Sequence, residues 1–374
     1  MKSIVIDARL YGPQHTGLGR YTKNLLIALK NTPDFKKYHF TLLVYPELKE
    51  TILKDLGNNF DYLSTNLRHY SLKEQIFLPI ILKKLRPDLV HFTHLDKAIF
   101  YRQKSLVTVH DLIRHFSKGP ETTTKNPVLY WPKYWAYLLM TRLIFLTSHL
   151  IVPSNFWKKF IIEKYHFNPK KIITTYEAVD PNFLIKTTKS HKNNFKKSNY
   201  IVYTGNLYPH KNIDVILKAL TKLPEIKLKI ICARSLFFDR ITQQISKYKL
   251  KKQVEFLGYL PDSDFSKIYH QALALVHPSF LEGFSLTGLE AMSLDCPVIA
   301  ANSSCLPEIY EDSVLYFDPY KSDELVSQIL KLKKSPKLRQ ELINKGHQQV
   351  SKYSWNKTAE KTISFYGQII NEKT

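Results

Sequence analysis

Short apolar runs alternate with longer segments of helical spacing along most of the chain. In the first half these runs are Ile4–Asp7, Phe40–Tyr45, Leu89–Phe92, Leu106–His110, Leu150–Ser154 and Lys171–Thr174. In the second half they are Tyr200–Tyr203, Leu228–Cys232, Val254–Phe256, Ala274–His277 and Cys296–Ala300. Continuous apolar runs separated by helix-length segments are typical of buried parallel strands with helices on both faces. The pattern therefore predicts an α/β protein built from doubly wound parallel sheets.

A segment of linker composition lies between the two sets of runs. Residues 184–199 are rich in lysine and asparagine and contain hardly any apolar residues,. We therefore expect one domain over residues 1–183 and a second over residues 200–354. A chain of 374 residues is long enough for each domain to bury its own core,.

Composition adds a cellular setting to this picture. Apolar content of 44% and charged content of 23% are typical of globular proteins,. The three cysteines have no pairing or metal-binding spacing, which favours reduced thiols in a cytosolic protein,. We expect neither a secretion signal nor a membrane span, because no apolar run reaches the roughly eighteen residues that a span needs.

The chain is strongly basic, with a net charge of +23 that is spread over both halves. Such a surface favours anionic partners, which include phosphates, anionic lipids and nucleic acid. The sequence has no zinc-finger spacing, basic zipper or RNA-binding aromatic motif,. We therefore expect no nucleic-acid partner, and a biased composition remains a second explanation of the charge.

The segment 282–291 carries the most specific chemistry. It lies between two strand-like runs, and Leu286 and Leu289 begin a helical spacing near Ser285,. The unpaired N–H groups of a first helical turn can hold an anionic oxygen. Glu282 lies just before this turn and Glu290 about one turn further in,. Amides for a phosphate and carboxylates for sugar hydroxyls predict a nucleotide-sugar site, although two solvated glutamates in an ordinary βαβ unit would give the same residues.

This segment resembles the Glu-x7-Glu signature of the retaining glycosyltransferases of family four, also called glycosyl transferases group 1. The resemblance extends to Phe256–Leu260, His277–Ser279 and Leu306–Glu308, in the family's order and spacing. It implies the GT-B fold, in which two Rossmann-like domains face a central cleft. It also implies an N-terminal acceptor domain, a C-terminal donor domain, and a last helix, residues 355–374, that crosses back onto the first domain.

The resemblance also implies roles for the residues of the donor site. Glu290 would bind the ribose hydroxyls and Glu282 the transferred sugar. The remaining expected contacts to the nucleotide sugar are Gly258, Tyr259, Leu260, Gly283, Phe284, Ser285 and Leu286.

A glycine pair follows the first predicted strand. Gly17 and Gly19 open a helix, so their backbone can approach a phosphate, but a tight structural turn explains them equally well,. The family has a similar loop, which faces the donor diphosphate and the acceptor. By this resemblance Arg20 and Tyr21 would contact the acceptor, with an ion pair inside the protein as the alternative for Arg20.

A second loop follows the first strand of the second domain. Lys211 lies in it and can neutralise a diphosphate and assist its departure, as the resemblance implies,. The family's commoner pattern has arginine after the glycine, whereas this chain has the neutral Asn206,. We still assign Asn206 to the donor site, with His210 or loop amides as substitutes for the missing charge.

A histidine and an aspartate end a strand of the first domain. A lone histidine at such a place is more often structural. The resemblance instead assigns His110 to the sugar or transition state and Asp111 to orienting it or the acceptor.

An aromatic segment with interleaved lysines covers residues 128–139. For Trp131–Tyr137 a membrane headgroup interface and a buried helix explain the composition equally well. We expect residues 138–145 to lie in the core.

The predicted activity is retaining transfer of a hexose from a nucleotide sugar to a glycan or lipid-linked acceptor. The motifs Ile-Asp-Ala-Arg, Gly-Leu-Gly-Arg-Tyr-Thr and Pro-His-Lys-Asn look most like those of bacterial polysaccharide mannosyltransferases. GDP-mannose is therefore the first expected donor and a UDP-hexose the second. We expect no metal and no cofactor, and a cytoplasmic protein with the inner face of the membrane as a further contact. The alternatives are a nucleotide-sugar-binding module without turnover and a basic nucleic-acid-binding protein.

Overall fold

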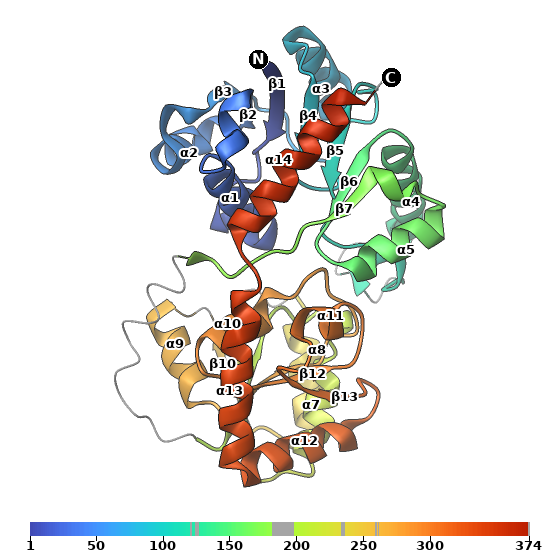
Figure 1. Cartoon of the computed structure of the whole chain (residues 1–374). Helices are drawn as coiled ribbons and strands as arrows, with labels where there is room; N and C mark the ends of the chain where they lie inside the picture. Colours follow the sequence, from blue (N-terminus) through green and yellow to red (C-terminus); the bar gives the residue numbers. More distant parts are fainter. Residues whose placement is uncertain are drawn as a thin grey trace. The chain divides into compact units, whose positions relative to one another are not determined.

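The chain divides into two compact units, each built on one parallel sheet (Figure 1). The computed structural model describes residues 1–119, 122–123, 127–181, 198–232, 236–258, 260 and 262–372. The first unit comprises Met1–Leu112, Trp131–Glu177 and Ser354–Thr374. The second comprises Ile113–Tyr130 and Ala178–Tyr353. Most of the expected linker, residues 184–197, lies outside the described residues.

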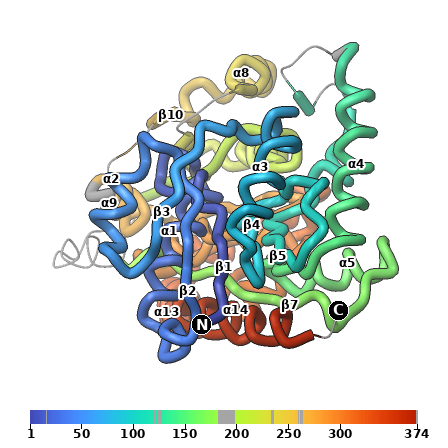
Figure 2. The backbone as a smooth tube through the Cα atoms, turned by 90° about the horizontal axis from the view of Figure 1, so that it is seen from above, coloured from blue at the N-terminus to red at the C-terminus, as the bar shows by residue number. Residues whose placement is uncertain are grey.

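The first unit has a seven-stranded sheet in the order β3-β2-β1-β4-β5-β6-β7 (Figure 2). Its strands are β1 (Lys2–Asp7), β2 (Tyr38–Val44), β3 (Asp61–Ser64), β4 (Leu89–Phe92), β5 (Ser105–Thr108), β6 (His149–Val152) and β7 (Ile172–Thr174). Its α-helices are α1 (Thr16–Leu29), α2 (Lys49–Leu56), α3 (Leu72–Leu85), α4 (Tyr130–Leu146), α5 (Asn155–Tyr165) and α14 (Trp355–Asn371). Strand β1 pairs with both β2 and β4, so the order reverses beside it, and ligands of such sheets bind at the carboxyl ends near this point,.

The last helix, α14, belongs to the first unit and packs against α1 (Figure 1). Trp355, Ala359, Ile363 and Tyr366 recur at helical spacing and are buried,. The Tyr366 hydroxyl lies 2.6 Å from His91 Nδ1 on β4. The apolar face of α14 therefore completes the core of the first unit.

The second unit has a six-stranded sheet in the order β10-β9-β8-β11-β12-β13. Its strands are β8 (Tyr200–Thr204), β9 (Lys227–Ile231), β10 (Val254–Gly258), β11 (Ala274–His277), β12 (Val298–Ala301) and β13 (Leu315–Phe317). Its α-helices are α7 (Ile213–Leu220), α8 (Phe238–Lys247), α9 (Asp262–Gln271), α10 (Leu286–Ser293), α11 (Leu306–Tyr310), α12 (Ser322–Lys334) and α13 (Pro336–Ser351). The order reverses between β8 and β11, and the loops after these two strands carry the predicted donor residues.

Short 3-10 turns connect several of these elements. They are η1 (Pro13–His15), η2 (Pro33–Lys37), η3 (Pro46–Leu48), η4 (Gly57–Asn59), η5 (Ile113–His115), η7 (Pro127–Leu129), η8 (Pro169–Lys171) and η9 (Pro209–Lys211). Turn η9 matters most for the site, because it carries Lys211.

The predicted α/β architecture with two doubly wound sheets is confirmed. The sequence pattern missed β3 and β13, which are three or four residues long and form sheet edges, where partly exposed strands lack a continuous apolar run,. In α4 the expected core over residues 138–145 is confirmed only for one face, since Ile144 and Phe145 are buried whereas Leu139 is exposed. Among the described residues, none of the helices is both long and apolar enough to cross a bilayer.

Candidate active site

An ion pair between two predicted catalytic residues forms the centre of the candidate site in the second unit. Lys211 follows β8 and Glu282 follows β11, so both lie at the carboxyl edge where the strand order reverses,. Lys211 Nζ lies 2.7 Å from Glu282 Oε1 and 2.9 Å from Oε2. An ammonium has three N–H donors, so these two bonds leave one for a further anion.

A buried polar network holds Glu282 in place. His277, at the end of β11, donates from Nε2 to Glu282 Oε1 over 2.9 Å, and Glu282 N donates to Ser304 Oγ over 3.2 Å. Burial alone would raise the pKa of Glu282, but Lys211 and His277 outweigh it and hold the pKa of Glu282 well below its ordinary value,. The Glu282 carboxylate is therefore charged at neutral pH and oriented from two sides.

The start of α10 is fixed by Tyr310. Its hydroxyl donates to Ser285 O over 3.0 Å, accepts from Gly288 N over 3.1 Å and lies 2.6 Å from Ser285 Oγ. A Cβ on Gly288 would come within 2.3 Å of the Tyr310 ring, so glycine is required there,. Ser285 is the N-cap of α10, with a left-handed φ of 85°. The first amides of the eight-residue helix, which have no helical partners, follow directly and suit an anion,.

The other predicted donor residues of this unit lie around the same edge. Glu290 is half-buried on α10, and Asn206 is exposed in the loop after Gly205. The backbone of Phe280 joins the two loops by donating to His210 O over 2.8 Å. Burial and the neighbouring Lys211 lower the pKa of His210 to about 4, so this ring is neutral at pH 7 and does not replace the missing arginine charge,.

Two donor predictions need revision or lie beyond the described residues. Gly258 ends β10 with φ of 66°, and Leu260 is half-buried, whereas Tyr259 lies outside the described residues. The Phe284 side chain is buried against the ring of Tyr353, so a ligand contact would have to involve the backbone of this segment. The chain also has an Asp-x-Asp triplet, 262–264, where α9 begins.

Three contacts hold the His110 side chain in the first unit. It follows β5, and its Nε2 donates to Thr93 O over 2.9 Å. Its Nδ1 lies 3.4 Å from Glu177 Oε1, and its ring meets Tyr21 edge-on with centroids 4.6 Å apart. Asp111, next along the chain, is exposed. His110 is thus held by a carbonyl, a carboxylate and a ring.

Tyr21, which was expected to contact an acceptor, has a buried side chain in this structure. Its side chain is only 2% exposed, and its hydroxyl lies 3.3 Å from Thr108 Oγ1. Tyr21 faces inward from α1 and supports His110, whereas Arg20 beside it is exposed. The alternation follows from the helix, which turns successive residues to different sides.

The two glycines of the predicted ligand loop, Gly17 and Gly19, differ in their surroundings. Gly17 is exposed, with no atom within 4 Å of a Cβ built on it. A Cβ on Gly19 would meet Gly12 O at 1.9 Å, so Gly19 serves close packing of α1 on the preceding loop,. The structural explanation of this loop therefore applies to Gly19, whereas Gly17 keeps its proposed contact with a ligand.

The Ile-Asp-Ala-Arg motif forms a buried ion network. Arg9 Nη2 lies 2.6 Å from both Asp7 Oδ2 and Glu74 Oε1, and Arg9 Nη1 donates to Leu67 O over 2.8 Å. All three charged side chains are almost wholly buried. The motif thus fixes the carboxyl end of β1 to the start of α3.

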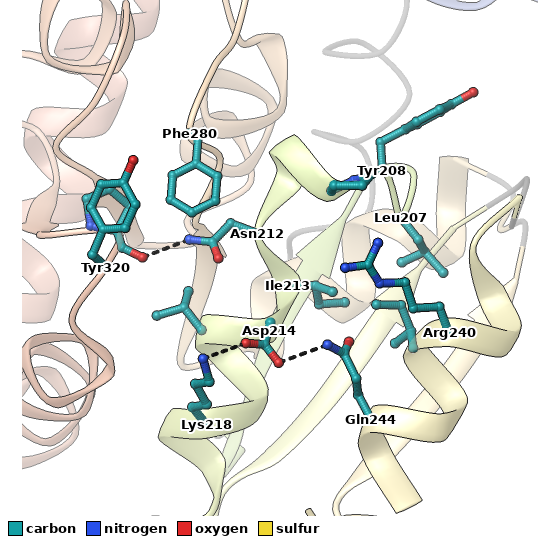
Figure 3. Close-up of a pocket in the computed structure, with 14 residues that line it drawn as sticks. Leu207, Tyr208, Asn212, Ile213, Asp214, Lys218, Arg240, Gln244, Phe280 and Tyr320 are labelled. Atoms are coloured by element: carbon teal, nitrogen blue, oxygen red, sulfur yellow. Dashed lines mark hydrogen bonds and ion pairs between the residues drawn. The ribbon is translucent and has the colours of Figure 1, made fainter. Parts of the chain in front are cut away.

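A separate pocket of about 310 Å³ lies between α7 and α8 (Figure 3). Asp214 lies 2.8 Å from Lys218 and accepts from Gln244 over 3.1 Å, with Arg240 on the same side as Gln244. Neither Glu282 nor Glu290 lines this pocket, so it is distinct from the ion-pair site.

Sequence reasoning missed His277 and Tyr310 as site residues. His277 was visible as a polar residue ending an apolar strand five residues before Glu282, which is a usable signal. Tyr310 had no such signal, because it reaches Ser285 from α11, 25 residues later.

Two Rossmann-like units, the second of which carries Lys211 and Glu282 at its reversal point, are the architecture of the glycosyltransferases of the GT-B fold. Residues 15–183 match the model described as Glycosyltransferase Family 4, and residues 185–349 match Glycosyl transferases group 1. Because the two matches together take in most of the chain, the chain belongs to this glycosyltransferase family.

The comparisons also give individual relatives. O-antigen chain mannosyltransferase B of Escherichia coli is 28% identical over 274 residues, 71% of this chain and 70% of that protein. O-antigen chain mannosyltransferase RfbU of Salmonella typhimurium is 24% identical over 370 residues, 94% and 96% of the two chains. The structure of Anabaena HepE in complex with UDP-glucose is similar in fold, with a TM-score of 0.70, 17% identity, and coverage of 98% of this chain and 100% of that one.

Proposed function

We propose that this glycosyltransferase moves a hexose from a nucleotide sugar with retention of anomeric configuration. The observation that carries the proposal is the Lys211–Glu282 ion pair directly before the start of α10, with Glu290 on the same helix. A cation, free helix amides and two carboxylates are what a diphosphate and a set of sugar hydroxyls need.

Each group has a distinct role in the proposal. Glu282 accepts hydrogen bonds from the transferred sugar, and Glu290 accepts them from the ribose. The remaining N–H of Lys211 and the amides at Leu286 stabilise the negative charge that develops on the departing diphosphate. The reaction passes through an oxocarbenium-like state, as in glycoside chemistry generally. No metal takes part in this scheme, because Lys211 and the amides supply the positive charge.

GDP-mannose is the first donor in the proposal and a UDP-hexose the second. The two relatives described above are named mannosyltransferases of O-antigen chains, which supports mannose and a surface-polysaccharide acceptor. HepE, which shares the fold, was solved in complex with UDP-glucose, and a UDP-hexose is therefore kept as the second donor.

A donor panel tests the proposal. GDP-mannose and several UDP-hexoses are supplied with and without lipid-linked acceptors, and the release of GDP or UDP is measured. We expect release with one donor class, and NMR of the product should show the anomeric configuration of the donor. Lys211→Met should lower turnover by about 10²–10³-fold, the usual cost of losing one charge-stabilising donor. Lys333→Met, which removes a surface lysine paired with Glu225, should leave turnover unchanged.

Nucleotide binding without turnover for any donor would instead support the binding-module alternative. The intact Lys211–Glu282 pair argues against that alternative, because a module that only binds has no leaving group to stabilise. Retention of full turnover by Lys211→Met would reject the assigned mechanism.

We further propose that the acceptor is lipid-linked and that α4 contacts an anionic membrane. Trp131 and Trp135 are 47% and 64% exposed on α4, and Lys133 lies between them. Amphipathic aromatic rings flanked by cations suit a headgroup interface, and each nearby cation adds about 1 kcal/mol on anionic lipid.

Vesicle flotation tests this contact. Binding should require anionic lipid, fall as salt rises, and weaken when Trp131 and Trp135 become alanine. Tyr320→Ala, at an exposed aromatic of the second unit, is the matched control. If the protein binds neither neutral nor anionic vesicles at low salt, the membrane contact is rejected and a soluble acceptor is favoured.

A further inference from the structure

Two histidines and an aspartate from separate loops meet at the carboxyl edge of the first sheet. His94 and Asp96 follow β4, and His69 lies in the segment between β3 and α3. Asp96 Oδ2 lies 3.2 Å from His69 Nδ1 and 3.8 Å from His94 Nε2. One ligand atom from each of the three residues lies within 4.8 Å of the others.

Three of the four ring nitrogens of the two imidazoles are buried without a hydrogen-bond partner among the described residues, whereas His69 Nδ1 contacts Asp96. The side chains of His94 and Asp96 are 3% and 2% exposed, and that of His69 is 8% exposed. Within the part of the chain that the structure describes, His94 Nδ1, His94 Nε2 and His69 Nε2 have no partner. A neutral imidazole has one N–H donor and one lone-pair acceptor. In His94 both are buried and neither has a hydrogen-bond partner in the described ranges. An imidazole lone pair held this way beside a carboxylate is a ready metal ligand.

The carboxylates around this cluster need a positive charge beyond that of Arg9, from a bound cation or from a proton on His69. Asp96 lies next to the buried network of Asp7, Arg9 and Glu74, since Tyr70 N donates to both Asp96 Oδ2 and Glu74 Oε2, over 3.0 and 2.8 Å. Three carboxylates thus face one guanidinium in a region with little solvent. Buried excess charge is costly unless it is paired or coordinates a metal.

We propose that His69, His94 and Asp96 bind one divalent transition-metal ion, with Zn²⁺ the best match. Tetrahedral zinc with ligands at about 2.0–2.1 Å requires ligand atoms about 3.3 Å apart, and the two measured distances bracket that spacing,. Nitrogen ligands with one carboxylate suit zinc better than magnesium or calcium, which prefer oxygen. Three protein ligands leave a fourth position for water.

The ion would tie the segment before α3 to the loop after β4. It carries no step of glycosyl transfer, so the proposal stands independently of the assigned reaction. The competing state of the same geometry has no metal and a proton on His69 shared with Asp96.

Metal content and affinity test the proposal in the full chain. The protein is stripped with a chelator, reloaded with ZnCl₂, and analysed by plasma mass spectrometry and by competition with a chromophoric chelator. We expect one zinc ion per chain. Asp96→Asn and His94→Gln should each lower zinc affinity at least about 100-fold, since even loss of a residue that only orients a ligand costs 10–100-fold.

A matched control distinguishes this cluster from a surface site. His347 lies 2.7 Å from Asp295 on the second unit and is exposed, so His347→Gln should leave zinc affinity unchanged. Loss of binding in His347→Gln but not in His94→Gln would overturn the proposal.

X-ray absorption of the zinc-loaded wild type keeps the test decisive if a variant fails to fold. We expect imidazole nitrogens and oxygen near 2.0–2.1 Å and no sulfur. Binding of less than a tenth of an equivalent at micromolar zinc, or a spectrum without imidazole, would show that the cluster is held by a proton instead.

Discussion

The Lys211–Glu282 pair makes a quantitative prediction about the stability of the second unit. In Lys211→Met the Glu282 carboxylate keeps His277 but loses two charged hydrogen bonds of 2.7 and 2.9 Å. Its side chain is only 10% exposed, so water does not replace them. Adding Glu282→Gln to Lys211→Met removes the stranded charge, and part of the lost stability should return.

The magnitude follows from burial. Breaking a fully buried ion pair costs about 3–5 kcal/mol, and the 20% exposure of Lys211 brings the expected cost to about 2–3 kcal/mol,. For a unit of this size each kcal/mol shifts Tm by about 2–4 °C, so Lys211→Met should lower its Tm by roughly 5–10 °C. The side chains of Lys333 and Glu225, which lie 3.0 Å apart, are more exposed than those of Lys211 and Glu282. The Lys333→Met change should therefore lower the free energy of unfolding by less than about 1 kcal/mol.

Calorimetry can assign the change to the correct unit. All four tryptophans of the chain, Trp131, Trp135, Trp157 and Trp355, lie in the first unit. The Tm of the second unit, measured by calorimetry, should therefore fall in Lys211→Met without a matching shift in the unfolding transition followed by tryptophan emission. A Tm shift in Lys211→Met no larger than in Lys333→Met would refute the burial argument. A double variant as unstable as the two single changes added together would show that the residues are not coupled.

Three further predictions concern binding, metal dependence and pH. Glu290→Ala should weaken nucleotide binding by about 1.5–3 kcal/mol, measured by calorimetry, whereas Glu282→Ala should mainly lower turnover. Equal nucleotide affinity in Glu290→Ala and wild type would contradict the assignment of Glu290 to the ribose. Transfer should survive EDTA, and recovery of lost activity by magnesium or manganese would contradict the scheme. Burial lowers the pKa of His91 from 6.5 to about 3, so the unfolded state binds more protons and stability falls as pH drops below 6.5, by up to about 1.4 kcal/mol per pH unit,. Tryptophan-monitored denaturation of His91→Gln should show a shallower loss between pH 6 and 4, and an unchanged slope would mean that His91 is protonated when folded.

The sequence predicted the fold well because buried parallel strands are continuous apolar runs, and these need no knowledge of tertiary contacts. It also predicted that Lys211 and Glu282 share one sheet edge, since both follow strands beside a reversal point. It did not predict that they bond to each other across 71 residues, because that depends on side-chain geometry. The burial of Tyr21 was unexpected for a related reason: its motif was visible in the sequence, but the side of α1 on which it lies was not.

Clusters assembled from distant loops are harder still to predict. His69 and Asp96 are 27 residues apart, with no spacing typical of a metal motif,. Only the fold, which brings the start of α3 beside the end of β4, places them together.

Ser285 shows why stability and activity are linked at the start of α10. A left-handed φ costs a non-glycine residue about 1–2 kcal/mol,. The Ser285 hydroxyl, 2.6 Å from Tyr310 Oη and 3.1 Å from His277 Nδ1, helps to offset that cost. Through its other ring nitrogen His277 also holds the Glu282 carboxylate. The same network therefore sets the backbone before the helix amides and orients the proposed sugar ligand, so a change that loosens one should loosen the other.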